Sequence, residues 1–390
     1  MGKCINHTSA KSLLQFIPDD AFAAIAADTQ VDYQVKKLYG KSMFYLLLYG
    51  LLESSRTSLR CMEDVFNSQK FKVLFNLNRE ATTKYNSISD RLATMNMEFF
   101  RQTYELLYLE FSKRYGKEDG LKYNITRVDS TMVVEAAAKL EAGMVVGTRK
   151  ETGPKQVKYT VSLTNLLPSS VEVYTAQQYL SEDMAIPQAV LNHVDRSRDN
   201  VFVFDRGVAS RKAFNTLDSE GLQFVTRVNP NARYRVVESA AIPATAMLGS
   251  LVLLKDEVVV LFDKRNAPSS AFRLLQTADE KGKPYWFLTN LFDDDPAEVV
   301  EMYRRRWDIE VFFRFIKQEL SFKHFVSTSV NGIMIMLYVT LILAMLVLMY
   351  KKANGLGYKT AKRRLNMEVE ELYLTLIIQL SGGDPSLVFR

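Results

Sequence analysis

The chain has 390 residues, of which 47% are hydrophobic and 24% are charged, and its formal net charge is +6. This length and apolar content allow large buried cores, so we expect two or three domains. Two cysteines exclude a disulfide scaffold and fit a reducing cytoplasm, and three histidines argue against a His/Cys zinc site. The positive balance favours a polyanionic partner.

The first part of the chain, up to about Tyr115, has a helical pattern. Apolar stretches at Lys41 to Leu52 and Leu59 to Asn67 alternate with polar turns, and Ser87 to Leu92 begins a further helix. Several short helices of this kind permit helix-turn-helix DNA binding. A helical packing region that makes no DNA contact is the alternative.

From Lys122 onward the pattern changes to alternating strands and helices. The predicted order is three strands, a helix, a strand, a helix and a strand: Tyr123 to Asp129, Val157 to Leu163, Val171 to Thr175, Ala189 to Val194, Asn200 to Asp205, Ser210 to Leu217 and Gln223 to Val228. Two of these strands end in an aspartate, Asp129 and Asp205. Carboxylates at strand ends are candidate ligands for hard divalent cations.

A charged stretch between Tyr303 and Lys317 follows Pro296 and contains no glycine or proline, which predicts one continuous helix. At helical spacing, Tyr303, Arg306, Glu310 and Lys317 project from one side of it; we call these four residues the signature stripe. A solvated charged face on an amphipathic helix is the simpler interpretation of the stripe taken alone.

Together these residues resemble the DDE insertion-sequence transposases of the Y-R-E-K signature, the insertion-sequence-four type. Tyr303, Arg306, Glu310 and Lys317 match the signature, and Asp129 and Asp205 match the first two acidic residues of the family. The resemblance implies an α/β chain with a ribonuclease-H-like catalytic core. Its mixed sheet would carry a β-rich insertion and be flanked by N-terminal and C-terminal helical regions.

On this resemblance we divide the chain into four regions. Residues 1–118 are expected to be a helical N-terminal region that binds DNA ends. Residues 119–228 and 289–350 would form the catalytic core, interrupted by a β-rich insertion at 229–288. Residues 351–390 would form a helical C-terminal region whose basic run from Lys351 to Arg364 contacts phosphates.

The resemblance also implies the activity. Asp129, Asp205 and Glu310 would be the catalytic residues and would hold two Mg²⁺ ions, with Mn²⁺ as a substitute. The enzyme would cleave DNA at the terminal inverted repeats of its own element, in this group often through a hairpin intermediate, and transfer the 3′ strand to target DNA. Holding two ends together requires a homodimer in a synaptic complex.

The remaining site residues are predicted DNA contacts. The resemblance implies that Tyr303, Arg306 and Lys317 contact the strand near the element end, and Arg314 adds positive charge. Either Tyr285 or Trp286 would stack on a flipped base. We also expect Lys155 and Lys158 to approach DNA phosphates, and strand propensity alone is the competing explanation for the two aromatic residues.

Gly332 to Tyr350 contains no charged residue and meets the length criterion for a membrane span. A helix that is apolar all round also fits the centre of a large domain, and we expect a buried helix that packs on the sheet and supports the Glu310 helix, with no membrane partner. Because Met1 to Ser12 lacks the apolar core of a signal peptide, we expect a bacterial cytoplasmic protein that is associated with the nucleoid when it binds DNA.

Two functional alternatives stay open. One is a ribonuclease-H-like DNA nuclease that cuts without strand transfer, and the other is a catalytically silent, transposase-derived DNA-binding protein.

Overall fold

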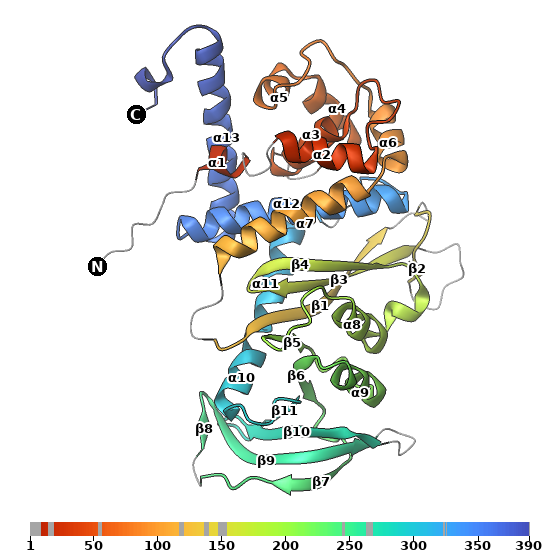
Figure 1. The fold of residues 1–390 in the computed structure, drawn as a ribbon, viewed down its shortest axis with the longest axis vertical. Helices are drawn as coiled ribbons and strands as arrows, with labels where there is room; N and C mark the ends of the chain where they lie inside the picture. Colours follow the sequence, from red (N-terminus) through yellow and green to blue (C-terminus); the bar gives the residue numbers. More distant parts are fainter. Residues whose placement is uncertain are drawn as a thin grey trace.

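The computed structural model describes residues 9–14, 19–53, 57–116, 121–135, 140–146, 154–243, 246–262, 268–322, 324 and 326–389. The molecule is elongated, with helices gathered at one end and one long sheet running through the rest (Figure 1). The helical end contains, among the described residues of the first part of the chain, α1 (Ala10–Leu14), α2 (Asp19–Thr29), α3 (Gly40–Glu53), α4 (Leu59–Asn67), α5 (Gln69–Leu74), α6 (Tyr85–Thr94) and α7 (Glu98–Tyr115).

The sheet begins with the strands of the predicted core: β1 (Asn124–Glu135), β2 (Met144–Val145), β3 (Lys155–Thr164), β4 (Leu167–Tyr174), β5 (Asn200–Phe204) and β6 (Gln223–Val228). β1 pairs antiparallel with β3 and parallel with β5, β3 pairs antiparallel with β4, and β5 pairs parallel with β6. This gives the strand order β4-β3-β1-β5-β6 of the expected ribonuclease-H-like core.

The strands that follow extend this sheet. They are β7 (Tyr234–Ser239), β8 (Met247–Leu248), β9 (Leu251–Phe262), β10 (Pro268–Ala278) and β11 (Pro284–Thr289). β11 pairs antiparallel with β6, and β10, β9 and β7 continue outward from it. The β-rich segment is therefore continuous with the core, because β11 returns to the free edge of β6 and β-pairing satisfies that edge.

Two details of this segment differ from the sequence prediction. The residue pattern predicts short β-prone runs at Leu251 to Leu254 and Val258 to Phe262, but these form one strand, β9, and the strand β10 has no corresponding prediction. Charged residues at Lys255, Asp256 and Glu257 suggest a turn, but Arg273 on β10 forms an ion pair with Asp256 at 2.7 Å between Nη2 and Oδ2. This cross-strand pair allows the charges to lie inside a strand.

Helices cover both faces of the sheet. α8 (Glu182–Leu191) and α9 (Arg211–Ser219) begin at serine N-caps, Ser181 and Ser210, and pack over Phe202, Phe204 and Phe224 on one face. On the other face lie α10 (Pro296–Arg304) and α11 (Trp307–Glu319). Short 3₁₀ turns occur at Gln177–Leu180 and Pro385–Leu387.

The most apolar helix is α12 (Val330–Ala353). It is the one helix within the described residues that is long and apolar enough to cross a membrane, and 83% of its most apolar window is buried inside the molecule. The expected buried helix is confirmed, but its neighbours differ from the expectation. α12 packs mainly against α7, α13, α3 and α6 and contacts the sheet at β4, so it joins the N-terminal helices to the core.

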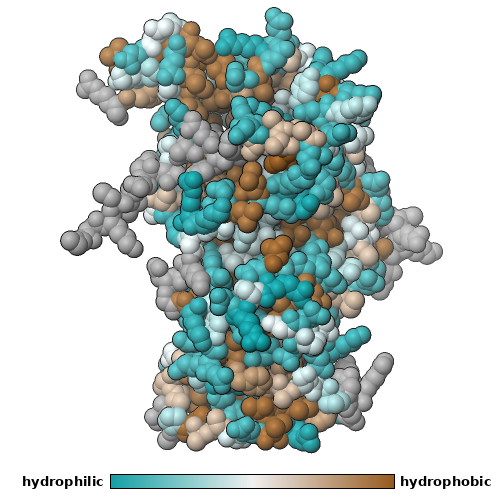
Figure 2. All heavy atoms as spheres, viewed as in Figure 1, coloured by the Kyte–Doolittle hydropathy of each residue, from teal (hydrophilic) through white to brown (hydrophobic). Residues whose placement is uncertain are grey.

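The last helix, α13 (Tyr358–Leu380), contacts α12, runs across its direction and ends far from the sheet (Figure 1). Apolar side chains gather at that end of the molecule (Figure 2), where Leu374, Leu380 and Leu387 are exposed. The basic run is not one continuous phosphate-binding surface. Lys352 and Lys362 donate to the main-chain oxygens of Tyr115 and Glu319, which end α7 and α11.

Candidate active site

Two predicted acidic residues meet where β5 ends beside β1. Asp205 follows the last residue of β5, as predicted, whereas β1 continues to Glu135, so the prediction that its strand ends at Asp129 is wrong. Val128 on β1 pairs with Phe204 on β5 in parallel register, so the next residues, Asp129 and Asp205, lie side by side. Neighbouring strands are about 5 Å apart. Each carboxylate also accepts a hydrogen bond from the amide that follows it, Ser130 N at 2.8 Å and Arg206 N at 2.7 Å, which fixes its orientation.

The third acidic residue reaches the same place through Arg306. The Arg306 guanidinium contacts Glu310 at 2.6 Å between Nη2 and Oε1 and lies 3.9 Å from Asp129 between Nη1 and Oδ2. Tyr303 donates its hydroxyl to Asp205 at 3.4 Å. The structure thus brings Asp129, Asp205, Glu310, Tyr303 and Arg306 together from three segments that are far apart in the sequence.

The signature stripe does not lie on one continuous helix, and that prediction is wrong. α10 ends at Arg304 and α11 begins at Trp307, with Arg305 and Arg306 between them. The Arg305 carbonyl accepts from Asp308 N at 3.2 Å and from Arg127 Nε at 2.7 Å. A buried arginine on β1 therefore donates to a main-chain oxygen at the break between the two helices, where Arg305 and Arg306 keep helical backbone angles.

Arg127 was not predicted as a site residue. It is fully buried two residues before Asp129 and forms an ion pair with Asp308 at 2.9 Å. The signal available in the sequence was a charged residue inside an apolar strand, since a buried arginine requires partners for its five donors. Arg127 therefore connects β1, which carries Asp129, to α11, which carries Glu310.

The Asp129 carboxyl is unusually poor at holding a negative charge. Burial raises its pKa from 3.8 to about 6 and outweighs the lowering by the Ser130 N–H and by Arg306, while Glu182 and Asp205 add smaller raising effects. Burial disfavours the ionised form because the surrounding protein solvates charge less well than water. A cation near Asp129 would relieve this cost.

A second ion pair lies beside the acidic residues. Glu182, at the start of α8, accepts from Ser130 Oγ at 3.0 Å and pairs with Lys158 at 2.9 Å. Lys158 is fully buried and donates to the Leu180 carbonyl, and Lys155 donates to the Leu140 carbonyl. The expectation that Lys158 contacts DNA is therefore wrong: its ammonium neutralises Glu182 inside the protein.

The two candidate aromatic residues lie on opposite faces of β11. The Tyr285 ring is 4.6 Å from the Arg227 guanidinium, which is itself 6.0 Å from the Tyr303 ring. These residues line a pocket of about 690 Å³ together with Arg304 and Phe287. Trp286 instead packs edge-on against Tyr234 on the α9 face, at 5.7 Å between ring centroids. Adjacent residues in a strand point to opposite faces.

The remaining predicted DNA contacts lie further along α11. Lys317 is half-buried two turns beyond Glu310, and Arg314 is exposed one turn beyond it. Arg227, which sequence reasoning missed, has a buried Nε without a hydrogen-bond partner. Arg227 lines the pocket shared by Tyr285 and Tyr303.

The donor chemistry fits a hard divalent cation in part. Asp129 and Asp205 supply adjacent carboxylate oxygens, the ligands that Mg²⁺ prefers. Glu310, however, is engaged by the Arg306 guanidinium, and no group of three His, Cys, Asp or Glu side chains in the described ranges is arranged to hold a metal ion. Glu310 must therefore exchange this contact before it can join the two aspartates on a metal.

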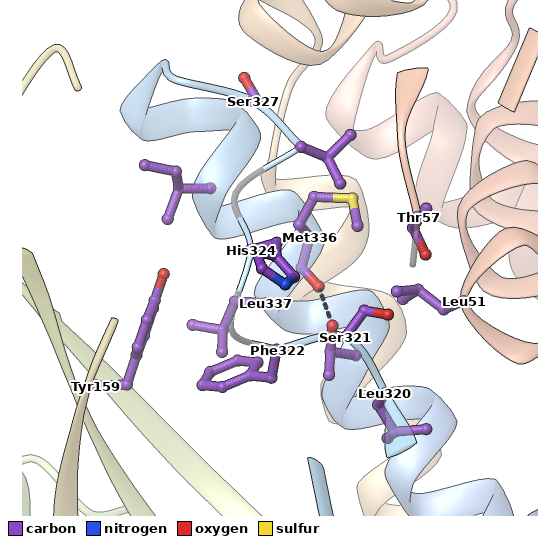
Figure 3. Close-up of a pocket in the computed structure, with 13 residues that line it drawn as sticks. Leu51, Thr57, Tyr159, Leu320, Ser321, Phe322, His324, Ser327, Met336 and Leu337 are labelled. Atoms are coloured by element: carbon purple, nitrogen blue, oxygen red, sulfur yellow. Dashed lines mark hydrogen bonds between the residues drawn. The ribbon is translucent and has the colours of Figure 1, made fainter. Parts of the chain in front are cut away.

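A small internal cavity is not part of this site. It measures about 30 Å³ and is lined by Tyr159, Ser321, His324 and Met336, beside the N-terminal helices (Figure 3). Its walls come from α3, β3, α12 and the segment that follows α11. A space of this size holds no more than a water molecule or two.

This fold and this grouping of acidic residues define a DDE-type transposase domain. The family model described as Transposase DDE domain matches residues 126–346, more than half of the chain, and the chain belongs to this family. The family implies dependence on a divalent metal ion. A second model, described as a domain of unknown function (DUF4372), matches residues 5–74.

Individual relatives agree with this assignment. The chain is 22% identical over 253 residues to a probable transposase for insertion sequence element IS5377 of Geobacillus stearothermophilus, covering 64% of this chain and 62% of the relative. It is 26% identical over 309 residues to a putative transposase for insertion sequence element IS4SA of Synechocystis, covering 78% of this chain and 80% of the relative.

A solved structure shares the fold. The piggyBac transposase in a synaptic complex with hairpin DNA aligns with a TM-score of 0.51 and 10% identity, over 97% of this chain and 83% of that chain. The similarity shows a ribonuclease-H-like DDE fold.

Proposed function

We propose that this chain cleaves DNA at the ends of its own insertion sequence and transfers the exposed 3′ strands into target DNA. The observation that carries the proposal is the meeting of Asp129, Asp205 and Glu310 around Arg306, from β1, the end of β5 and α11. The raised pKa of Asp129 supports a site built to receive a cation.

Asp129, Asp205 and Glu310 would hold two Mg²⁺ ions, with Mn²⁺ as a substitute. When bound, the metal supplies Lewis-acid activation of a water or 3′ hydroxyl and stabilises the leaving 3′ oxygen. Arg306 then serves two purposes. Its guanidinium neutralises Asp129 and Glu310 before loading, and on releasing Glu310 it becomes free to grip a phosphate in bidentate fashion.

The strand of the element end would run over the pocket between β11 and α10. Tyr303 and Arg306 lie beside the acidic residues, and Tyr285 and Arg227 offer an aromatic face and a guanidinium for an extrahelical base and its phosphate. Tyr285 lines this pocket and Trp286 lies on the opposite face of β11, which favours Tyr285 for the contact with the base. Lys317 and Arg314 would extend the phosphate contacts along α11.

The partners would be the terminal inverted repeats and target DNA, held by a homodimer in a synaptic complex in the bacterial cytoplasm. In the N-terminal region, Lys36, Lys37 and Lys84 line a cleft of about 880 Å³ that supports a role in binding DNA ends. The exposed apolar end of α13 supports dimer formation, because isolated apolar surface of this kind favours burial against another chain.

The deciding experiment is a cleavage assay on DNA that spans the chain's own element end and flanking sequence. We expect cleavage with Mg²⁺ or Mn²⁺, followed by joining of the 3′ ends to a plasmid target. Asp129→Ala, Asp205→Ala and Glu310→Ala should each abolish cleavage and retain end binding in a gel-shift assay. Full cleavage by any of the three variants would reject this metal-site assignment, and cleavage without joining would favour the nuclease alternative.

A further inference from the structure

A cleft lies on the other side of Asp205 from the signature stripe. It measures about 480 Å³ and is lined by Asp205, Arg206, Gly207, Val208, Ala209, Arg211, Val228, Asn229, Asn231 and Ala232. We call it the Arg206 cleft. Asp205 is the one carboxylate among these lining residues, and the other polar side chains are two arginines and two asparagines. This chemistry suits a phosphodiester backbone with base edges.

The side chains of the cleft are available to a ligand. Arg206, Asn229 and Asn231 are exposed. Within the described part of the chain, the Arg206 guanidinium makes no hydrogen bond or ion pair, and only its main-chain N–H is engaged, by Asp205 Oδ1 at 2.7 Å. An exposed arginine without a carboxylate partner can bind a phosphate with both of its outer nitrogens.

The walls of the cleft are held in place by the fold. On one side, Asp183 of α8 accepts from Ser210 N at 2.8 Å and also from Ala209 N, which fixes the turn after Asp205. On the other side, Asn231 N donates to Asn229 Oδ1 at 3.1 Å in the turn after β6. A preformed cleft loses little conformational freedom when a strand binds.

The strand β6 separates this cleft from the pocket assigned to the element end. Arg227 lines the pocket with Tyr285 and Tyr303, whereas its neighbour Val228 lines the Arg206 cleft, because adjacent residues face opposite sides of a sheet. Asp205 lies between them: it lines the cleft and accepts from Tyr303. A DNA segment in each depression would meet at the acidic residues.

We propose that the Arg206 cleft binds the target DNA during strand transfer. This inference rests on the proposed function, since joining requires two DNA segments at one set of acidic residues. In that step the 3′ oxygen of the element end forms a bond to a target phosphorus, the bond from that phosphorus to the target 3′ oxygen breaks, and the proton of the attacking hydroxyl ends on the leaving oxygen. The Arg206 guanidinium holds the target strand beside Asp205.

The test separates cleavage from joining. Arg206→Glu and Asn231→Asp place negative charge in the cleft, and Arg206→Lys keeps the charge of Arg206. The matched control is Arg198→Ala, because Arg198 is an equally exposed arginine before β5, at the end of that strand opposite to Asp205. Each full-length variant is assayed for cleavage of an uncut element end and for joining of precleaved ends to a plasmid.

For Arg206→Glu and Asn231→Asp we expect joining of precleaved ends to fall at least tenfold, while cleavage of uncut ends stays within threefold of the unmodified chain. Arg206→Lys should recover most joining, and Arg198→Ala should behave as the unmodified chain does. Joining that is unchanged in Arg206→Glu would overturn the proposal, and so would an equal loss of cleavage and joining, which assigns the cleft to the flanking DNA. Absence of cleavage by the unmodified chain would instead reject the proposed function itself.

Discussion

At the scale of single residues, the site contains charged side chains whose burial lowers the stability of the folded protein. The Asp129 side chain is 22% exposed, and its pKa lies well above the ordinary value because the surrounding protein replaces water. Arg306 partly offsets this cost, since its guanidinium lies between Asp129 and Glu310. Such strain is typical of groups whose natural partner is a metal ion or a substrate.

Asp129→Asn should therefore stabilise the metal-free protein while abolishing cleavage. Because the folded-state pKa of about 6 exceeds the usual 3.8, the ionised Asp129 carboxylate lowers the stability of the folded protein. This loss of stability is complete above pH 6, becomes smaller as the pH falls towards 3.8, and is absent below pH 3.8. At pH 7.5 the gain in unfolding free energy should be ~1 to 3 kcal/mol. Denaturant unfolding in EDTA at pH 7.5 and at pH 4 measures this gain in unfolding free energy. A gain that is equal at both pH values would contradict the raised pKa of Asp129.

Arg306→Ala should weaken binding to the element end and make the remaining binding less sensitive to salt. Each phosphate contact that is lost lowers the slope of log affinity against log salt by about one. The measurement is fluorescence anisotropy with a labelled end duplex between 50 and 200 mM salt, roughly the range over which such slopes are defined. Arg196→Ala is the control, because Arg196 is exposed, paired with Glu220 and not among the residues that line the pocket between β11 and α10. An unchanged slope would remove Arg306 from the phosphate contacts.

At the scale of elements, the break between α10 and α11 lies against β1. Tyr303 of α10 donates to Asp205, and Arg306 in the break lies between Asp129 and Glu310. The Arg127 guanidinium of β1 donates to both the Arg305 carbonyl and the Asp308 carboxylate. A strand residue thus contacts both the break and the first turn of α11.

Arg127→Met should leave the Arg305 carbonyl without this donor and release Asp308, at a cost of about 2 to 4 kcal/mol in unfolding free energy. Cleavage should fall more than end binding does, because Glu310 and Arg306 move relative to Asp129. Arg127→Lys should be intermediate, since an ammonium cannot reproduce the forked contacts of a guanidinium. Urea unfolding measures the loss of stability, and the Mn²⁺ concentration for half-maximal cleavage measures the effect on the acidic residues. An unchanged Mn²⁺ requirement would show that the role of Arg127 is purely structural.

At the scale of the whole molecule, the N-terminal helices and the end of the chain share one core. Buried residues of α3 and α7, such as Phe44 and Phe111, lie in the same cluster as Leu343 and Met345 of α12 and Ile316 of α11. The predicted boundary near residue 118 therefore separates regions in the sequence but not two separately packed cores.

A fragment of residues 1–118 should not fold alone, because removing α12 exposes the apolar faces of α3, α6 and α7 to water. We expect a broad, weakly cooperative thermal transition by circular dichroism, against one cooperative transition for the full chain. Adding a peptide of residues 330–353 in trans is the matched control. A sharp transition of the fragment alone would show that the N-terminal region is independent.

The amino-acid sequence alone was enough to indicate the Asp205 strand end, the Glu310 helix, the ribonuclease-H-like order of elements and the burial of α12. These follow from local periodicity and from residue types at fixed spacing. Only the tertiary structure decided the continuation of β1 past Asp129, the helix break at Arg305, the inward direction of Lys158, the side of β11 that Tyr285 faces and the cleft beside Arg206. Each of these depends on a hydrogen bond, an ion pair or a strand register between segments that are distant in the chain. Such contacts produce no periodic pattern in the sequence of the residues that make them.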